Sequence, residues 1–215
     1  MTEFSCEAIL FDLDGVLVDS TKSVVVVWTA WSKKNGISPA KTLDVIHGRR
    51  TIEGLQILAP HLDLESETKK IEAAITLKKE GTIAIPGAAS LLSSLPKDRW
   101  CVVTSGLKEF ARIRLKDANL PIPEILVSAD DVTKGKPDPE PYLKGAQLMK
   151  VDPAKCIVIE DAPNGIRAGR AAGIRVIGVG TTYPVSELKE ANAVAKTMEG
   201  ISASSRQGQI TIHVE

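Results

Sequence analysis

The chain has 215 residues, with 27 basic and 27 acidic side chains and a formal net charge of zero. This length suffices for one domain with a sizeable core, or for one domain with a small insertion. A balanced charge argues against a dedicated nucleic-acid-binding protein, which usually carries a basic patch and a high pI. We therefore expect no nucleic-acid partner.

The hydropathy pattern gives no sign of a membrane segment. No apolar run approaches the ~20 residues that a helix needs to cross a bilayer. The N-terminus lacks a basic segment followed by a signal-like apolar stretch. We therefore expect a cytoplasmic protein without a membrane partner. Cys6, Cys101 and Cys156 stand at the starts of predicted strands and form no CxxC pair, which indicates reduced, packed thiols.

The first predicted element is a strand over residues 7–11, whose continuous apolar run is typical of a strand buried on both faces. It leads into Asp12-Leu13-Asp14-Gly15, two carboxylates one residue apart followed by a glycine. An unpaired buried charge is very costly, so this strand must end in a polar crevice or beside a positive group. In open α/β sheets, ligands bind at the carboxyl ends of strands. Asp12 and Asp14 are therefore candidate site residues, the alternative being a simple polar turn.

Residues 16–83 are expected to form an all-helical insertion. Its first helix, over residues 19–35, ends at an Asn-Gly stop signal, although its valines have strand propensity. Further helices are expected over residues 39–45, 51–59 and 66–80, the last of them opened by Ser66. The remainder, residues 1–15 and 84–215, is expected to form the core domain.

An alternation of strands and helices follows the insertion. Strands are expected over residues 99–103, 124–127, 156–159 and 174–179, and helices over residues 88–95, 108–118, 140–149 and 164–172. Such alternation implies a Rossmann-like α/β fold, with a parallel sheet covered by helices on both faces. In the tail, residues 193–195 and 210–212 are expected as short edge strands and residues 199–209 as a loop.

Polar residues recur where the predicted strands end. Thr104-Ser105-Gly106 follows one strand, Glu160-Asp161 follows another, and Lys136 lies in a loop between them. Because parallel strands end at one edge of a sheet, these groups should converge on Asp12 and Asp14.

Carboxylates crowded together repel each other unless a cation is present. Oxygen ligands without histidine or thiol favour Mg²⁺ over zinc, and Mg²⁺ commonly binds carboxylates, water and a substrate phosphate oxygen. The Thr104 hydroxyl, the Lys136 ammonium and backbone N–H groups would bind the remaining phosphate oxygens. The pattern predicts a phosphoryl-transfer site, and the lack of a Walker loop argues against a nucleotide-driven kinase.

Four segments resemble, in the right order, the motifs of the haloacid dehalogenase-like hydrolases. They are Asp-Leu-Asp-Gly, Val-Val-Thr-Ser-Gly, Gly-Lys-Pro-Asp-Pro and Ile-Glu-Asp-Ala-Pro-Asn-Gly-Ile. The helical insertion is similar to the cap of one subfamily, and the run Ile-His-Gly-Arg-Arg-Thr-Ile-Glu (46–53) resembles a cap segment of glycerol-phosphate and deoxyglucose-phosphate phosphatases. The resemblance implies an Mg²⁺-dependent phosphatase that acts on small sugar or polyol phosphates.

The resemblance also implies a role for each motif residue. Asp12 would attack phosphorus and become an aspartyl-phosphate, since a carboxylate is a known phosphoryl acceptor. Asp14 would protonate the leaving alcohol and then take a proton from the hydrolytic water. Thr104 and Lys136 would hold the phosphoryl group.

The same resemblance implies a set of metal ligands. Mg²⁺ would be bound by Asp12, Asp161 and the backbone carbonyl of Asp14, while Glu160 would either support this site or ligate the metal itself.

Other residues are candidates for contact with the substrate. Ser105 and Gly106 belong to the second motif. Arg49, with His47, would reach substrate hydroxyls or help to close the cleft, the alternative for Arg49 being a solvated helix face. Asn164 would touch the substrate or cap the helix that follows it.

Two other functions stay open at this point. A sugar phosphomutase would use the same nucleophile and a similar cap, and a non-catalytic binding protein would use the same fold without the reaction. A dehalogenase is disfavoured, because Asp14 supplies an acid that carbon–halogen displacement does not need. We expect a monomer whose partner is a small phosphate ester.

Overall fold

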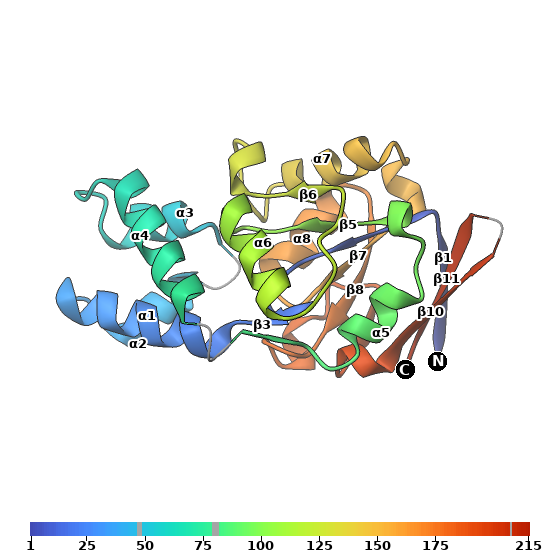
Figure 1. Cartoon of the computed structure of the whole chain (residues 1–215), viewed down its shortest axis with the longest axis horizontal. Helices are drawn as coiled ribbons and strands as arrows, with labels where there is room; N and C mark the ends of the chain where they lie inside the picture. Colours follow the sequence, from blue (N-terminus) through green and yellow to red (C-terminus); the bar gives the residue numbers. More distant parts are fainter. Residues whose placement is uncertain (47–48, 79–81, 207) are drawn as a thin grey trace.

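The computed structural model describes residues 1–46, 49–78, 82–206 and 208–215 (Figure 1). Its central sheet has the strand order β6-β5-β2-β7-β8-β9, and each neighbouring pair in it is parallel. The strands are β2 (Ala8–Phe11), β5 (Trp100–Val103), β6 (Leu126–Val127), β7 (Cys156–Glu160), β8 (Arg175–Val179) and β9 (Ala193–Ala195). The predicted parallel α/β sheet is confirmed, and β9 lies at one of its edges, as expected.

Helices cover both faces of this sheet. Side chains alternate across a strand, so Ile9 and Phe11 of β2 join one apolar cluster while Ala8 and Leu10 join the other. The first cluster includes residues of α5 (Ala88–Ser93) and α6 (Lys108–Asp117), and the second includes residues of α7 (Glu140–Met149) and α8 (Pro163–Ala171). Burial on both faces explains why β2 is apolar throughout.

The helical insertion lies at one end of the long axis of the molecule (Figure 1). It contains α1 (Thr21–Lys34), α2 (Pro39–Ile46), α3 (Thr51–Leu58) and α4 (Leu64–Leu77), packed around an apolar cluster of their own. Trp28 and Trp31 lie in this cluster, ring edge to ring face, with centroids 5.3 Å apart. Two short antiparallel strands, β3 (Val18–Asp19) and β4 (Ile83–Ala84), join the insertion to the core.

Helix α4 does not begin at Ser66, as the sequence suggested. It begins two residues earlier, because the side chain of Asp63 accepts a hydrogen bond from the Ser66 backbone N–H at 3.1 Å and caps the helix. The helix ends at Leu77, and the predicted end at residue 80 lies outside the described residues.

A second sheet lies at the opposite end of the molecule, with the antiparallel order β1-β11-β10 (Figure 1). Its strands are β1 (Thr2–Cys6), β10 (Ile201–Arg206) and β11 (Gln209–Val214). The predicted loop over residues 199–209 is therefore wrong. The serine-rich sequence of β10 gives little sign of a strand, and the strand forms through its pairing with β11. β11 is the middle strand of this sheet rather than an edge strand.

Short 3₁₀ turns connect several elements: η2 (Lys97–Arg99), η3 (Ala129–Asp131), η4 (Pro153–Lys155), η5 (Val185–Glu187) and η6 (Met198–Gly200). Cys6, Cys101 and Cys156 are free and buried, as expected. Within the described ranges, no helix has the length and apolar character needed to cross a membrane.

Candidate active site

The polar residues predicted at the strand ends converge at the carboxyl edge of the central sheet. Asp12 follows β2, Thr104 follows β5, and Glu160 and Asp161 lie at the end of β7. These three strands are neighbours in the sheet, in the order β5-β2-β7. Asp12 and Thr104 continue the sheet pattern, since their backbone N–H groups donate to Ile159 and Val127 at 3.0 and 2.9 Å. The topology thus brings together residues that are far apart in the sequence.

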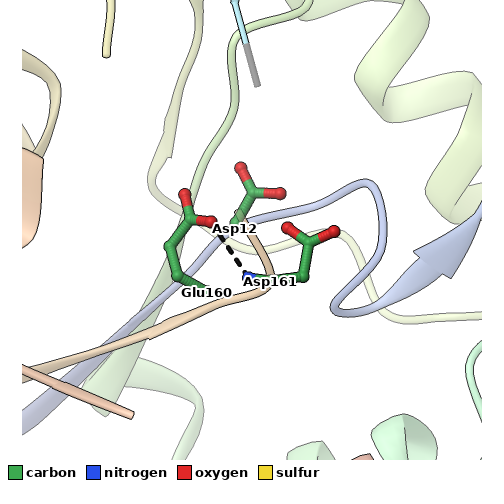
Figure 2. Close-up of side chains that lie close together, drawn as sticks. All are labelled: Asp12, Glu160 and Asp161. Carbon is green, nitrogen blue, oxygen red and sulfur yellow. Dashed lines mark hydrogen bonds between the residues drawn. The ribbon is translucent and has the colours of Figure 1, made fainter. Parts of the chain in front are cut away.

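Three buried carboxylates form the centre of this site. One oxygen from each of Asp12, Glu160 and Asp161 lies within 4.8 Å of the others (Figure 2). Burial raises the pKa of Asp12, against the opposing effect of the Lys136 ammonium, and Glu160 adds to the rise. Burial followed by repulsion from Glu160 also raises the pKa of Asp161. A bound cation would favour the ionised forms, so this donor set is consistent with a metal site.

Lys136 is the cation that the structure places against these carboxylates. Its side chain is buried, and its Nζ donates to Asp12 Oδ1 at 2.5 Å, to Glu160 Oε1 at 2.7 Å and to the carbonyl oxygen of Val103 at 3.1 Å. The attraction of the two carboxylates raises the pKa of the Lys136 ammonium although burial opposes it. The lysine is therefore held in its charged form beside Asp12.

Glu160 is surrounded by protein hydrogen-bond donors. In addition to Lys136, its Oε1 accepts a hydrogen bond from the Tyr142 hydroxyl at 2.8 Å. Its Oε2 accepts from the backbone N–H groups of Asp161 and Ala162, at 3.0 and 3.1 Å (Figure 2 shows the first of these). Both oxygens are thus engaged within the protein, which suits a residue that orients its neighbours.

Two glycines allow the close packing around the carboxylates. Gly15 has φ +90°, and a Cβ there would lie 1.9 Å from Asp161 Oδ2. A Cβ on Gly165 would lie 1.6 Å from Glu160 Oε1. No larger residue fits at either position without moving a carboxylate. Gly165 lies in the fourth motif, but its role was not predicted from the sequence.

The carboxylate of Asp14 faces different partners. Its Oδ1 accepts a hydrogen bond from the Ser20 hydroxyl and its Oδ2 from Arg114 Nη1, both at 2.6 Å. Arg114 Nη2 donates to Glu72 on helix α4, and the Thr51 hydroxyl donates to the other oxygen of Glu72 at 2.5 Å. Sequence reasoning missed Arg114, Glu72 and Thr51, because isolated polar residues on amphipathic helices usually lie on solvated faces.

A cavity of about 150 Å³ lies between the sheet edge and the helical insertion. From the core side it is lined by the predicted residues Asp12, Asp14, Thr104, Ser105, Gly106, Lys136, Glu160 and Asp161. From the insertion, Arg49, Thr51 and Glu72 contribute polar groups, while Val24, Val25, Trp28, Ile46 and Ile75 form an apolar wall. Thr182 and Tyr183 also line the cavity, and neither was predicted from the sequence.

One of the predicted substrate contacts does not line this cavity. The Asn164 Oδ1 accepts a hydrogen bond from Arg167 at 2.8 Å, and Asn164 is not among the residues that line the cavity. It does not cap α8 either, because that helix begins at Pro163 with Ala162 as its N-cap. His47 lies outside the described residues.

The insertion also contacts the loop that carries Lys136. Arg50 donates to the carbonyl oxygens of Val132 and Thr133, at 3.3 and 2.9 Å. Glu53 accepts a hydrogen bond from the backbone N–H of Gly135 at 3.2 Å. These contacts, which the sequence did not suggest, hold helix α3 against the core beside the loop that carries Lys136.

Comparisons with known proteins agree with this arrangement. A family model described as haloacid dehalogenase-like hydrolase matches residues 6–173. Hexitol phosphatase A of Escherichia coli is 41% identical over 204 residues, which cover 93% of this chain and 94% of that protein. Glycerol-1-phosphate phosphohydrolase 2 of Saccharomyces cerevisiae is 38% identical over 208 residues, which cover 90% of this chain and 83% of that protein.

A solved structure of a hydrolase from Pseudomonas syringae has a TM-score of 0.79 to this chain at 30% identity, covering 89% of this chain and 94% of that one. The similarity thus includes both the parallel sheet and the helical insertion. With its motif residues gathered at one sheet edge and these matches along most of its length, the chain belongs to the haloacid dehalogenase-like hydrolases.

Proposed function

We propose that the protein is an Mg²⁺-dependent phosphatase that hydrolyses a small sugar or polyol phosphate through an aspartyl-phosphate. The observation that carries this proposal is the buried Asp12 carboxylate, with Lys136 Nζ at 2.5 Å and the Asp161 carboxylate beside it. The substrate class is supported by the relatives, whose names refer to hexitol phosphatase and glycerol-1-phosphate phosphohydrolase activities.

Asp12 is the nucleophile in this mechanism. Its Oδ1 is held by Lys136, which leaves Oδ2 to attack phosphorus. A bond forms from this oxygen to phosphorus as the ester P–O bond breaks, and the leaving alcohol departs. Water then attacks the phosphorus of the aspartyl-phosphate, which releases inorganic phosphate and restores the Asp12 carboxylate. The Thr104 hydroxyl and the positive charge of Lys136 stabilise the phosphoryl oxygens through both steps.

The metal site combines the nucleophile with the carboxylate beside it. Asp12 and Asp161, with the backbone carbonyl of Asp14, would hold Mg²⁺, which supplies positive charge to the phosphoryl oxygens when bound. Glu160 orients Lys136 and the turn after β7, because its two oxygens already accept hydrogen bonds from protein donors.

Asp14 is the acid and base of the reaction. It lines the same cavity as Asp12 and lies two residues after it in the chain. Protonated Asp14 gives its proton to the leaving alkoxide, and its carboxylate then accepts a proton from the attacking water. One group therefore serves both steps and is restored at the end of the cycle.

Helices α1–α4 act as the cap of the active site. They cover the cavity, and their docked position excludes water while the aspartyl-phosphate exists. Arg49 and the apolar wall face the leaving group and select it, while Ser105 and Gly106 face the phosphoryl group from the core side. Strands β3 and β4 connect the cap to the core.

The test is phosphate release from a panel of small phosphate esters, with Mg²⁺ and with a chelator. Wild-type protein should release phosphate from sugar or polyol phosphates only with Mg²⁺, and Asp12→Asn should release none. Asp98→Asn, at an exposed aspartate away from the cavity, is the matched control and should behave like wild type. Near-full activity in Asp12→Asn would refute the mechanism, and an isomeric phosphate in place of inorganic phosphate would indicate a mutase.

A further inference from the structure

We propose that Arg114 is a positioning residue for Asp14, and that Glu72 makes this positioning depend on the docked cap. The inference deepens the proposed function and rests on it. It starts from a line of hydrogen-bonded side chains that crosses the boundary between core and cap. That line runs from Asp14 through Arg114 and Glu72 to Thr51.

Arg114 stands at the centre of this line. It lies on α6, its side chain is 4% exposed, and its two terminal nitrogens donate to different carboxylates. Nη1 donates to Asp14 Oδ2 at 2.6 Å, and Nη2 donates to Glu72 Oε2. A guanidinium is planar with donors in fixed directions, so binding one carboxylate on each nitrogen fixes the orientation of both.

This arrangement distinguishes the two oxygens of Asp14. Oδ2 accepts a hydrogen bond from Arg114 Nη1 at 2.6 Å, and the fixed direction of that donor sets the position of this oxygen. The other oxygen, Oδ1, faces the Ser20 hydroxyl at 2.6 Å, and a hydroxyl can donate or accept. With one partner on each oxygen, the plane and direction of the Asp14 carboxylate are fixed relative to the cavity that it lines.

The other two residues of this line, Glu72 and Thr51, link it to the cap. Glu72 lies on α4 and Thr51 begins α3, so both belong to the cap, whereas Arg114 and Asp14 belong to the core. If the cap moved away, Arg114 would keep Asp14 and lose Glu72. A buried charge that loses a partner must find another, so the guanidinium would reorient and take Asp14 with it. Asp14 is thus aligned for proton transfer when the cap is docked.

The decisive experiment compares esters that differ in their need for an acid. The leaving alcohol of glycerol phosphate needs a proton, whereas the phenolate of p-nitrophenyl phosphate departs without one. The rate of Asp12 phosphorylation is measured by rapid quench in the first turnover for each ester. The variants are Arg114→Gln, Arg114→Lys and Glu72→Gln, and the control is Arg112→Gln, at an exposed arginine on the same helix.

The expected result is a loss that depends on the leaving group. Arg114→Gln should lower the phosphorylation rate from glycerol phosphate by ~10²-fold, the effect of a catalytic group misplaced by about 1 Å, with little change in KM. With p-nitrophenyl phosphate the rate should change by less than about threefold, because no proton transfer is needed there. Arg114→Lys should restore part of the rate, and Arg112→Gln should match wild type.

Glu72→Gln should show a smaller loss of the same kind. In the double variant with Arg114→Gln the loss should not exceed that of Arg114→Gln alone, because residues that act as one unit are not additive. Full additivity of the two losses would overturn the link to the cap.

Other outcomes separate the inference from the proposed function. Equal losses with both esters would mean that Arg114 has only a structural role, and unchanged rates would also overturn the proposal. If Arg114→Gln does not fold, the proposal is tested with Arg114→Lys and Glu72→Gln. Wild-type phosphorylation rates in both of these variants would contradict it. Wild-type protein that is inert with both esters would instead refute the phosphatase function.

Discussion

The loss of Lys136 has consequences for stability that follow directly from its contacts. Its side chain is buried between Asp12, at 2.5 Å, and Glu160, at 2.7 Å. Lys136→Met keeps an apolar side chain of similar length but removes the ammonium charge and its hydrogen-bond donors. Two buried carboxylates then lose the cation that they share, and Asp12 also loses the group that holds its Oδ1 in place.

The magnitude follows from the cost of an unpaired buried charge. Removing one partner of a buried ion pair destabilises a protein by about 3–5 kcal/mol. For a chain of this size, 1 kcal/mol moves Tm by about 2–4 °C, so Lys136→Met in chelator should melt about 6–20 °C below wild type. Mg²⁺ should recover part of this loss, because a cation at Asp12 and Asp161 replaces positive charge. A ligand at 100 times its Kd contributes about 2.7 kcal/mol.

The assay is thermal unfolding by circular dichroism, with Mg²⁺ and with chelator. Lys134→Met is the matched control, because Lys134 lies in the same loop with a side chain that is 71% exposed. Its change should stay within about 0.5 kcal/mol. Two results would refute the stabilising role of Lys136. One is an equal Tm for Lys136→Met and Lys134→Met in chelator. The other is a rise in the Tm of Lys136→Met with Mg²⁺ that is no larger than the rise for wild type.

Three further predictions concern the same site and the core. Asp14→Asn should lose ~10²–10⁴-fold in turnover of alkyl phosphates, measured as phosphate release, since an amide transfers no proton. Gly165→Ala should displace Glu160 and lower both Tm and turnover, whereas Gly200→Ala, where a Cβ would have its nearest contact at 3.6 Å, should not. A thiol reagent should label the native protein only upon unfolding, because burial raises the pKa of Cys6 to about 11 and of Cys156 to about 12; rapid labelling of folded protein would contradict this.

The sequence by itself predicted the sheet and most of the catalytic centre. Continuous apolar runs marked β2, β5 and β7 as buried strands, and their alternation with helices required a parallel sheet. Parallel strands end at one edge, so Asp12, Thr104 and Asp161 had to converge there. These features are local in the chain or follow from topology alone, which is why they could be predicted without coordinates.

Tertiary structure decided the parts that depend on distant partners. Asp14 and Arg114 are 100 residues apart, and Arg114 and Glu72 are 42 apart, so neither pairing leaves a local pattern. Strand β10 lacks an apolar repeat of its own and exists because β11 offers it hydrogen-bonding partners. A buried ion pair and a polar strand both derive their stability from a neighbour, and only the folded chain specifies which neighbour that is.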